Sequence, residues 1–332
     1  MNLQENETKV TQWAERNAAV LGLSGSPITV SYIYNPGGFV NQSYRISDGI
    51  TSRHLKLAPS AKIPRLRQWA RVSKLLEDRC RAPKLICEIE DEIIPEYRYG
   101  LAFDFIPGTQ LSNAAAPDSA VLQVLDTLRQ LHGDRELAIA LEEGVPTALT
   151  CADAFVDAYI NRFEEDMKSI RTGKQLLDFV TDETLDWFDA EIDSLKKTVL
   201  NHPAFQQRAR DVVHNDIGWN NVLLGEQGGV GIIDWDDLSA NGDAAMDYSV
   251  LLWPYHNKPE WTFWQEKVRS LAGDELNDRL SLYFRAKLLD DVIDILADYV
   301  ESEHIPELKE ITQSRARAIH LKAYPEYVQL YG

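Results

Sequence analysis

The sequence has few cysteines, no excess of positive charge and no long apolar run, and each absence excludes a class of protein. Its three cysteines, Cys80, Cys87 and Cys151, are odd in number and lack the close spacing of metal ligands, so they indicate free thiols in a reducing cytoplasm. No apolar stretch approaches the roughly 18 residues of a membrane-spanning helix, and the amino-terminal residues lack the basic and apolar regions of a signal peptide. We therefore expect a cytoplasmic protein without a membrane partner.

The charge is strongly negative and unevenly distributed. A net charge of −18 argues against nucleic acid as a partner, because a phosphate backbone requires a basic face. Residues 1–110 contain 14 Lys and Arg against 12 Asp and Glu, whereas residues 111–332 contain 20 against 40. Two interpretations stay open: the acidic half serves solubility, or it attracts a cation while the near-neutral half handles an anion.

The periodicity of apolar residues changes along the chain. The first part contains short runs typical of strands, such as "ITVSYIY" and "SRHLKLA", together with helical patterns over 7–21 and 64–80. The later part is dominated by helical spacing, and its clear strand signal is one hairpin. Helices are expected there over 119–132, 151–171, 176–200, 260–272 and 275–302.

The change of character falls in the loop-like stretch "PGTQLSNAAAPDS" (107–119). We predict an α+β fold with a small β-rich amino-terminal lobe built on an antiparallel sheet (1–106) and a larger, mainly helical carboxy-terminal lobe (107–332). Clefts between such lobes hold ligands.

The segment "VVHNDIGWNNVLLGEQGGVGIIDWDD" (212–237) carries the candidate active site. Its two apolar runs, joined by "EQGG", predict a β-hairpin with the pairs 222:233, 223:232 and 224:231. The next pair outward places Asn221 beside Asp234, and an amide oxygen next to a carboxylate suits Mg²⁺. Asp216 lies on the preceding loop, where its carboxylate can reach a substrate hydroxyl, and the ring of His214 can bond the loop backbone. Singly these residues are ordinary turn and packing residues, but jointly they form a specific constellation.

This segment resembles the catalytic segment of the aminoglycoside phosphotransferase and choline kinase-like superfamily of small-molecule kinases, which has a protein-kinase-like fold. The shared pattern is H-x-D-x-x-x-x-N, then I-D-W, then G-D-x-x-x-D. The resemblance implies that Asp216 is the catalytic base and that Asn221 and Asp234 hold Mg²⁺. It also implies that Asp243 and Asp247 brace the catalytic loop, although a helix N-cap and a first-turn acid explain these two equally well.

Weaker similarities extend the match over roughly residues 28–300. The stretch "NPGGFVNQSYRI" resembles the family's phosphate-covering hairpin, "SRHLKLA" resembles the strand whose lysine pairs with ATP phosphates, and "LAFDFIPGTQL" resembles the hinge whose backbone bonds adenine. The nucleotide-binding residues that this implies are Lys56, Gly37, Gly38, Asn41, Asp104 and Ile106.

Two residues depart from the family pattern. Gln68 stands where a glutamate usually pairs with the strand lysine, so either Glu77 serves instead or Lys56 is held in another way. Val40 stands where a serine is common in the phosphate hairpin, which removes a side-chain donor.

The activity implied is ATP-dependent transfer of the γ-phosphate to a hydroxyl of a small molecule, with Mg²⁺ as cofactor and GTP as an alternative to ATP. Such transfer requires mainly positioning and neutralisation of charge. One alternative within the same class is a choline, amino-alcohol or other metabolite kinase. An alternative in a different class is a non-catalytic nucleotide-binding pseudokinase, which only Gln68 and Val40 support.

The acceptor depends on how the acidic row in "LLDDVIDILADYV" is interpreted. Asp290, Asp294 and Asp298 form either a solvated helix face or part of a pocket for a cationic acceptor, such as an aminoglycoside-like antibiotic. The aromatic residues that would join such a pocket, or else belong to the core, are Trp253, Tyr255, Trp261 and Trp264.

Overall fold

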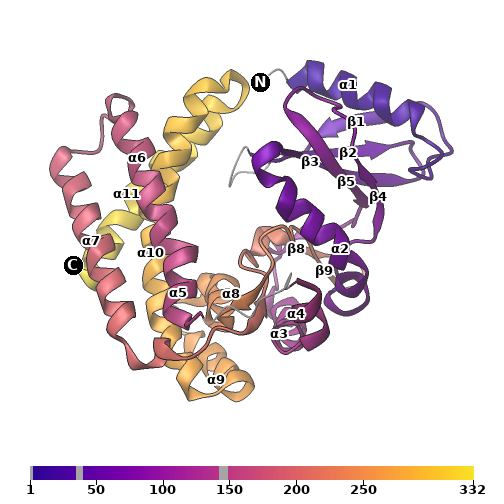
Figure 1. The fold of residues 1–332 in the computed structure, drawn as a ribbon. Coiled ribbons are helices and arrows are strands. Elements are labelled where there is room, and N and C mark those ends of the chain that lie inside the picture. The colour runs from indigo at the N-terminus through magenta and orange to yellow at the C-terminus, as the bar shows by residue number, and fades with distance from the viewer. Residues whose placement is uncertain (1–2, 35–39, 142–148) are drawn as a thin grey trace. The chain divides into compact units, whose positions relative to one another are not determined.

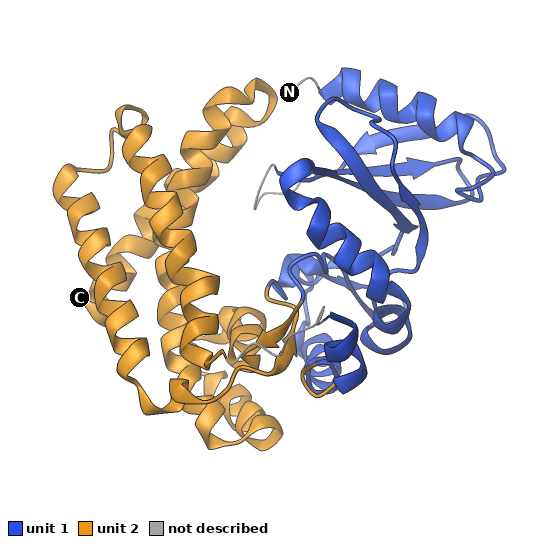
Figure 2. Cartoon of the chain, viewed as in Figure 1, with its two compact units in different colours: residues 1–131, 135–143, 216–238 blue, residues 132–134, 144–215, 239–332 orange. Residues whose placement is uncertain are grey.

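The chain forms two compact units (Figures 1 and 2). The computed structural model describes residues 3–34, 40–141 and 149–332, so Gly37 and Gly38 lie outside the described residues. Unit 1 contains residues 1–131, 135–143 and 216–238, and unit 2 contains residues 132–134, 144–215 and 239–332. The predicted assignment of nucleotide and acceptor binding to lobes divided at residue 107 stays a prediction.

Unit 1 is built on a five-stranded antiparallel sheet with the strand order β1-β2-β3-β5-β4. The alternation of apolar and polar residues predicted these strands, because successive side chains of a strand point to opposite faces. The strands are β1 (Thr29–Tyr32), β2 (Gln42–Ser47), β3 (Ser52–Pro59), β4 (Leu85–Ile89) and β5 (Tyr97–Asp104).

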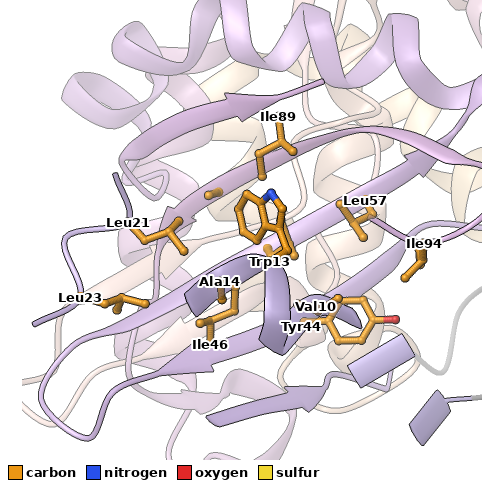
Figure 3. Packing of buried hydrophobic residues seen from close by; sticks show 12 residues of the cluster. Val10, Trp13, Ala14, Leu21, Leu23, Tyr44, Ile46, Leu57, Ile89 and Ile94 are labelled. Carbon is orange, nitrogen blue, oxygen red and sulfur yellow. The ribbon is translucent and has the colours of Figure 1, made fainter. Parts of the chain in front are cut away.

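The two faces of this sheet are covered by different helices. On one face α1 (Leu3–Arg16) buries Val10, Trp13 and Ala14 in a cluster that includes Leu55 and Leu57 of β3 (Figure 3). On the other face α2 (Ile63–Cys80) stacks the ring of Trp69 on Phe103, with centroids 4.4 Å apart. The strand alternation therefore turns Lys56 away from the apolar cluster and toward Trp69, whose ring centroid lies 5.7 Å from the ammonium.

The remainder of unit 1 includes a second, smaller sheet with the order β6-β8-β9. Strand β6 (Thr109–Gln110) pairs with β8 (Val222–Leu224), which pairs in turn with β9 (Val230–Ile232). The amide of Ile232 donates to the carbonyl of Arg81, the left-handed residue that ends α2, at 3.1 Å. The remaining helices are α3 (Asp118–His132), whose last residue is grouped with unit 2, and α4 (Arg135–Leu141).

Unit 2 is mainly helical, and the long helix α10 packs against α6, α8 and α11. One strand pair, β7 (Asp211–Val213) with β10 (Ser239–Gly242), stands among the helices. A π-helical segment, Val156–Ile160, connects α5 and α6. The helices are α5 (Cys151–Phe155), α6 (Asn161–Thr172), α7 (Asp182–Asn201), α8 (Ala244–Leu252), α9 (Trp261–Ala272), α10 (Asp274–Glu301) and α11 (Pro306–Tyr331).

An antiparallel amino-terminal sheet followed by a mainly helical remainder confirms the predicted α+β class. The helix expected over 176–200 begins only at Asp182, because Thr181 caps its amino terminus by accepting a hydrogen bond from the amide of Thr184. No helix in the described part of the chain is long and apolar enough to cross a membrane.

Candidate active site

The hairpin of residues 222–232 differs from its predicted register by one residue. Val222 pairs with Ile232, Leu223 with Gly231 and Leu224 with Val230, so the predicted pairing was wrong. The amide of Gly225 donates to the carbonyl of Gly229 at 2.9 Å, which leaves a three-residue turn ending in the left-handed Gly228 (φ +79°). Turns of three residues with a left-handed glycine are common in hairpins. The observed turn is therefore one residue shorter than the four-residue turn "EQGG" that was predicted.

The corrected register changes the neighbour of Asn221. The amide of Ile233 donates to the carbonyl of Asn221 at 2.9 Å, so Asn221 lies opposite Ile233, and not opposite Asp234 as predicted. Asp234 follows the ladder in a left-handed conformation (φ +68°), which is unusual for a residue with a side chain. Such backbone strain concentrates at functional sites, and here it separates Asp234 from the strand that precedes it.

Asp216 and Asn221 are joined directly. The amide nitrogen of Asn221 donates to both the carboxylate Oδ2 and the backbone carbonyl of Asp216, each at 2.8 Å. Because the amide nitrogen faces Asp216, the amide oxygen of Asn221 points the other way and can accept a cation. One side chain thus contacts the predicted base, while the binding of Mg²⁺ by its oxygen stays a prediction.

Lys56 is buried and contacts two carboxylates. Its ammonium pairs with Asp234 and lies 2.7 Å from Oδ1 of Asp236. The other oxygen of Asp236, Oδ2, accepts a hydrogen bond from the amide nitrogen of Asn41 at 2.8 Å. This cluster brings together three predicted site residues: Lys56 in β3, Asn41 just before β2 and Asp234 just after β9.

The electrostatics of this cluster are set by burial and by the opposite charges of the lysine and the two aspartates. Burial favours the neutral form of Lys56, but the two carboxylates outweigh it and raise the pKa of the lysine. Burial, assisted by the neighbouring Asp236, raises the pKa of Asp234 against the influence of Lys56. For Asp236 burial acts in the same direction, but Lys56 and hydrogen bonding with Asp234 prevail and lower the pKa. Full ionisation of both carboxylates would place two negative charges beside one ammonium, and the raised pKa of Asp234 reflects this imbalance.

The residues immediately before Asp216 are fixed by Asp247 of α8, which is fully buried. Its Oδ2 accepts the amide of His214 at 2.9 Å, and its Oδ1 accepts the amide of Asn215 at 2.8 Å. Asn215 is left-handed (φ +69°), so this carboxylate holds a strained turn in place. Nε2 of His132 lies 3.0 Å from the same Oδ2. The predicted bracing role of Asp247 is therefore visible as hydrogen bonds, while the role of the His214 ring stays a prediction.

Asp243 holds the helix that carries Asp247. Its Oδ1 caps α8 by accepting the amide of Ala245 at 3.0 Å, and the buried Arg279 of α10 binds both carboxylate oxygens, at 2.7 and 2.9 Å. Asp243 is therefore the N-cap of α8 and also links this helix to α10, so its two interpretations are compatible. The stretch "LDTLRQLHGD", which resembles the family's helix ending in Leu-His, contains His132, but its contact with Asp247 lies 115 residues away and was not predicted. The sequence offered no signal for Arg279, whose partner lies 36 residues away.

Two amides of the backbone that was predicted to bind adenine already donate hydrogen bonds to carbonyl groups of unit 1. The amide of Asp104 donates to the carbonyl of Lys84 at 2.9 Å, and that of Phe105 donates to the carbonyl of Ser52 at 3.3 Å. The carboxylate of Asp104 pairs with Arg53 at 2.6 Å. Ile106 packs so closely on the hairpin that a Cβ added to Gly231 would lie 2.9 Å from two of its side-chain carbons. Hydrogen bonding by the Asp104–Ile106 backbone to adenine stays a prediction.

Neither α2 residue considered as a partner of Lys56 contacts it in the structure. The side-chain amide of Gln68 donates to the carbonyl of Leu238 at 2.6 Å, and Glu77 lies 3.5 Å from Lys74 on the surface of the helix. Sequence reasoning did not assign Asp236 to the site, although the repeated acid in "DWD" was its signal.

The acidic row of α10 is not a solvated helix face. Asp290 is mostly buried, pairing with Arg162 of α6 and, at 2.7 Å, with Lys287. Burial and Asp290 raise the pKa of Asp294 to about 6, and burial with Asp294 raises the pKa of Asp298 to about 8.

The aromatic residues named with this row belong to the packing around α9 and α10. Tyr255 and Trp264 are buried and stacked with centroids 4.6 Å apart, and Trp261 packs edge-on against Phe284 at 5.0 Å. The core interpretation is confirmed for Tyr255 and Trp264, whereas Trp253 and Trp261 are only half-buried.

A buried strand lysine, a hairpin followed by an acid, and a braced loop carrying a second acid define a kinase-like phosphotransferase. Residues 32–289 match the model of the phosphotransferase enzyme family. The chain belongs to this family and is a small-molecule kinase.

Solved structures show the same fold at low sequence identity. The GDP complex of aminoglycoside 2′-phosphotransferase-IIIa is 15% identical, with a TM-score of 0.62 and coverage of 96% of this chain and 99% of that chain. Spectinomycin phosphotransferase in complex with ADP and spectinomycin is 18% identical, with a TM-score of 0.57 and coverage of 97% and 94%. Choline kinase LicA from Streptococcus pneumoniae is 16% identical, with a TM-score of 0.55 and coverage of 94% and 98%. The predicted kinase-like fold is thereby confirmed.

Proposed function

We propose that this protein transfers the γ-phosphate of ATP to a hydroxyl group of a small cationic molecule. The observation that carries the proposal is the pairing of a buried lysine with the carboxylates that follow the hairpin, together with the hydrogen bond from Asn221 to Asp216. These residues supply the charge and the positioning that phosphoryl transfer needs. The ADP and GDP complexes of the similar phosphotransferases support a nucleoside triphosphate as the donor.

The roles follow from the geometry of each side chain. Asp216, held by the amide of Asn221, would orient the acceptor hydroxyl and accept its proton. Asn221 and Asp234 would hold Mg²⁺, since one presents an amide oxygen and the other a half-buried carboxylate, both ligands that Mg²⁺ prefers. When bound, the metal would neutralise charge on the β- and γ-phosphates. Lys56 would bind the α- and β-phosphates, and the backbone of residues 104–106 would form hydrogen bonds with the adenine ring.

The cationic acceptor is favoured by an acidic cluster within unit 2. Burial raises the pKa values of four acids in this cluster, namely Asp166 of α6 and Asp294, Asp298 and Glu301 of α10. For the three aspartates, neighbouring acids raise the pKa values further. Such mutual repulsion is relieved by protons or by a bound cation. An aminoglycoside-like antibiotic or an amino alcohol such as choline carries amines with this charge, and the similar solved structures include proteins named for both classes of substrate.

The test is release of ADP or GDP by purified protein with Mg²⁺, ATP or GTP, and a panel of acceptors. The panel contains aminoglycosides, spectinomycin, choline and ethanolamine as cations, and macrolides, homoserine and simple sugars as comparators. Stimulation by a cationic acceptor, with a KM that rises with salt, supports the proposal. Stimulation by a neutral acceptor alone refutes the cationic part. Binding of nucleotide without turnover on any acceptor favours a pseudokinase.

A further inference from the structure

Lys56 requires a counter-ion that remains with it during the reaction. A buried ammonium is costly unless it is paired, and Lys56 is only 4% exposed. Among the described residues its acidic partners are Asp234 and Asp236. The helix that normally provides a glutamate in this family has Gln68 at that position, and its amide is committed to the carbonyl of Leu238.

Asp234 is poorly suited to be the permanent partner of the lysine. The proposed function assigns it to the metal, and a carboxylate bound to a divalent cation interacts less strongly with a neighbouring ammonium. Asp236 has no such assignment. Its Oδ1 accepts from Lys56 at 2.7 Å and its Oδ2 accepts from Asn41 at 2.8 Å, so it binds both residues that the family resemblance places at the nucleotide phosphates.

The segment that carries Asp236 is anchored on both sides. Before it, the fully buried Trp235 donates from its ring nitrogen to the carbonyl of Ile232 at 2.8 Å. After it, the carbonyl of Leu238 accepts the side-chain amide of Gln68 at 2.6 Å. The helix α2 therefore supports the lysine indirectly, by holding the backbone next to the acid that pairs with it.

We propose that Asp236 is the positioning residue for Lys56, replacing the helix glutamate of related kinases, while Gln68 holds the segment that presents Asp236. The proposal rests on the proposed function for the role of Lys56 at the phosphates. A merely structural Asp236 would affect folding alone, and a metal-binding Asp236 would change the requirement for Mg²⁺. A positioning role predicts instead that the effect of substituting Asp236 on nucleotide affinity depends on whether Lys56 is present.

The test is a double-mutant cycle between Lys56→Met and Asp236→Asn in the 332-residue chain. The measured quantities are the affinity for Mg·ADP, from a fluorescent ADP analogue, the Mg²⁺ concentration for half-maximal binding, and the Tm. Asp237→Asn is the matched control, because Asp237 is the next acid but pairs with Arg65 on the surface, where their side chains are 43% and 51% exposed. Surface pairs of this kind contribute little.

We expect Asp236→Asn to weaken Mg·ADP binding about 10-fold, in line with other side chains that orient a ligand-binding group. The same change in the Lys56→Met background should have no further effect on affinity and a smaller effect on the Tm. With an active acceptor, the KM for ATP should rise while the KM for the acceptor stays constant. The control should match the wild type.

Three results would overturn the proposal: additive losses in the cycle, a higher Mg²⁺ requirement in Asp236→Asn, or unchanged Mg·ADP affinity in that variant. Failure of the proposed function is distinguishable, because it appears as absence of turnover in the wild type while the Mg·ADP cycle still gives a result. A wild type that binds no Mg·ADP contradicts both.

Discussion

Replacing Asp247 by asparagine should separate bracing of the catalytic loop from the chemistry that the loop performs. The carboxylate accepts the amides of His214 and Asn215 through different oxygens, and it is fully buried. An asparagine offers a single oxygen, so one amide would keep an acceptor and the other would face the NH₂ group. The substitution preserves shape and removes both the charge and one hydrogen bond.

The magnitude follows from the two losses. A hydrogen bond to a charged group is worth about 1.5–3 kcal/mol, and a buried donor left unpaired costs about 1–3 kcal/mol. The free energy of unfolding should therefore fall by about 2.5–6 kcal/mol. At about 2–4 °C per kcal/mol for a domain of this size class, the Tm of unit 2 should fall by about 5–24 °C. Displacement of the adjoining Asp216 should also lower kcat by roughly 10²-fold, because catalysis depends on placement to within about 1 Å.

The assay is calorimetric unfolding combined with steady-state kinetics well below the Tm of the variant. Asp274→Asn is the control, since Asp274 is an acid at the start of α10 whose side chain is 85% exposed. It should leave the Tm and kcat unchanged. An Asp247→Asn protein with wild-type Tm and kcat would refute the reasoning, because one of the two amides would then have lost its acceptor without consequence.

Three further predictions concern other parts of the site and its surroundings. Asp216→Asn should lower kcat by roughly 10²–10⁴-fold with an unchanged nucleotide Kd, measured by titration calorimetry, and full activity would exclude Asp216 as the base. Asp298 has its pKa raised to about 8 by burial and by Asp294 and Glu301, so the folded protein holds this proton more tightly than the unfolded chain, and stability should fall as the pH rises from about 4 to about 8. Asp298→Asn should raise the Tm at pH 8 and have little effect at pH 4, and an equal effect at both values would contradict this. Gly242→Ala would place a Cβ 2.0 Å from Val213 and should cost about 1–3 kcal/mol of unfolding free energy in denaturant titrations, whereas Gly229→Ala, with open space around its Cβ, should be neutral.

The elements that sequence predicted well are those whose buried residues are aliphatic or aromatic. Helix α2 was expected over 64–80 and spans Ile63–Cys80, because Leu66, Trp69 and Val72 mark its inner face. Helix α11 was not expected at all. Its buried positions include Thr312, Ala316 and His320, so its inner face carries too little apolar contrast to produce a visible period.

The site was predictable where its residues lie close in the sequence. The loop and hairpin that carry Asp216, Asn221 and Asp234 were located from spacing, but the register was wrong by one residue because several glycines could occupy the turn. The partners of Lys56 could not be found from the sequence, since Asp236 lies 180 residues away. Only the folded chain shows that Gln68 is already engaged elsewhere.

The return of β8 and β9 to unit 1 has a consequence for how the protein is made. Strand β6 obtains its partner from Leu223 and Leu224, and the partners of Lys56 come from Asp234 and Asp236. During synthesis the amino-terminal sheet can form early, but Lys56 must wait without its counter-ions until more than a hundred further residues, most of them belonging to unit 2, have left the ribosome. A fragment ending before residue 216 would expose β6 and a buried lysine, and such surfaces promote aggregation. A separately expressed unit 1 would therefore need residues 216–238 joined to its amino-terminal part in order to fold.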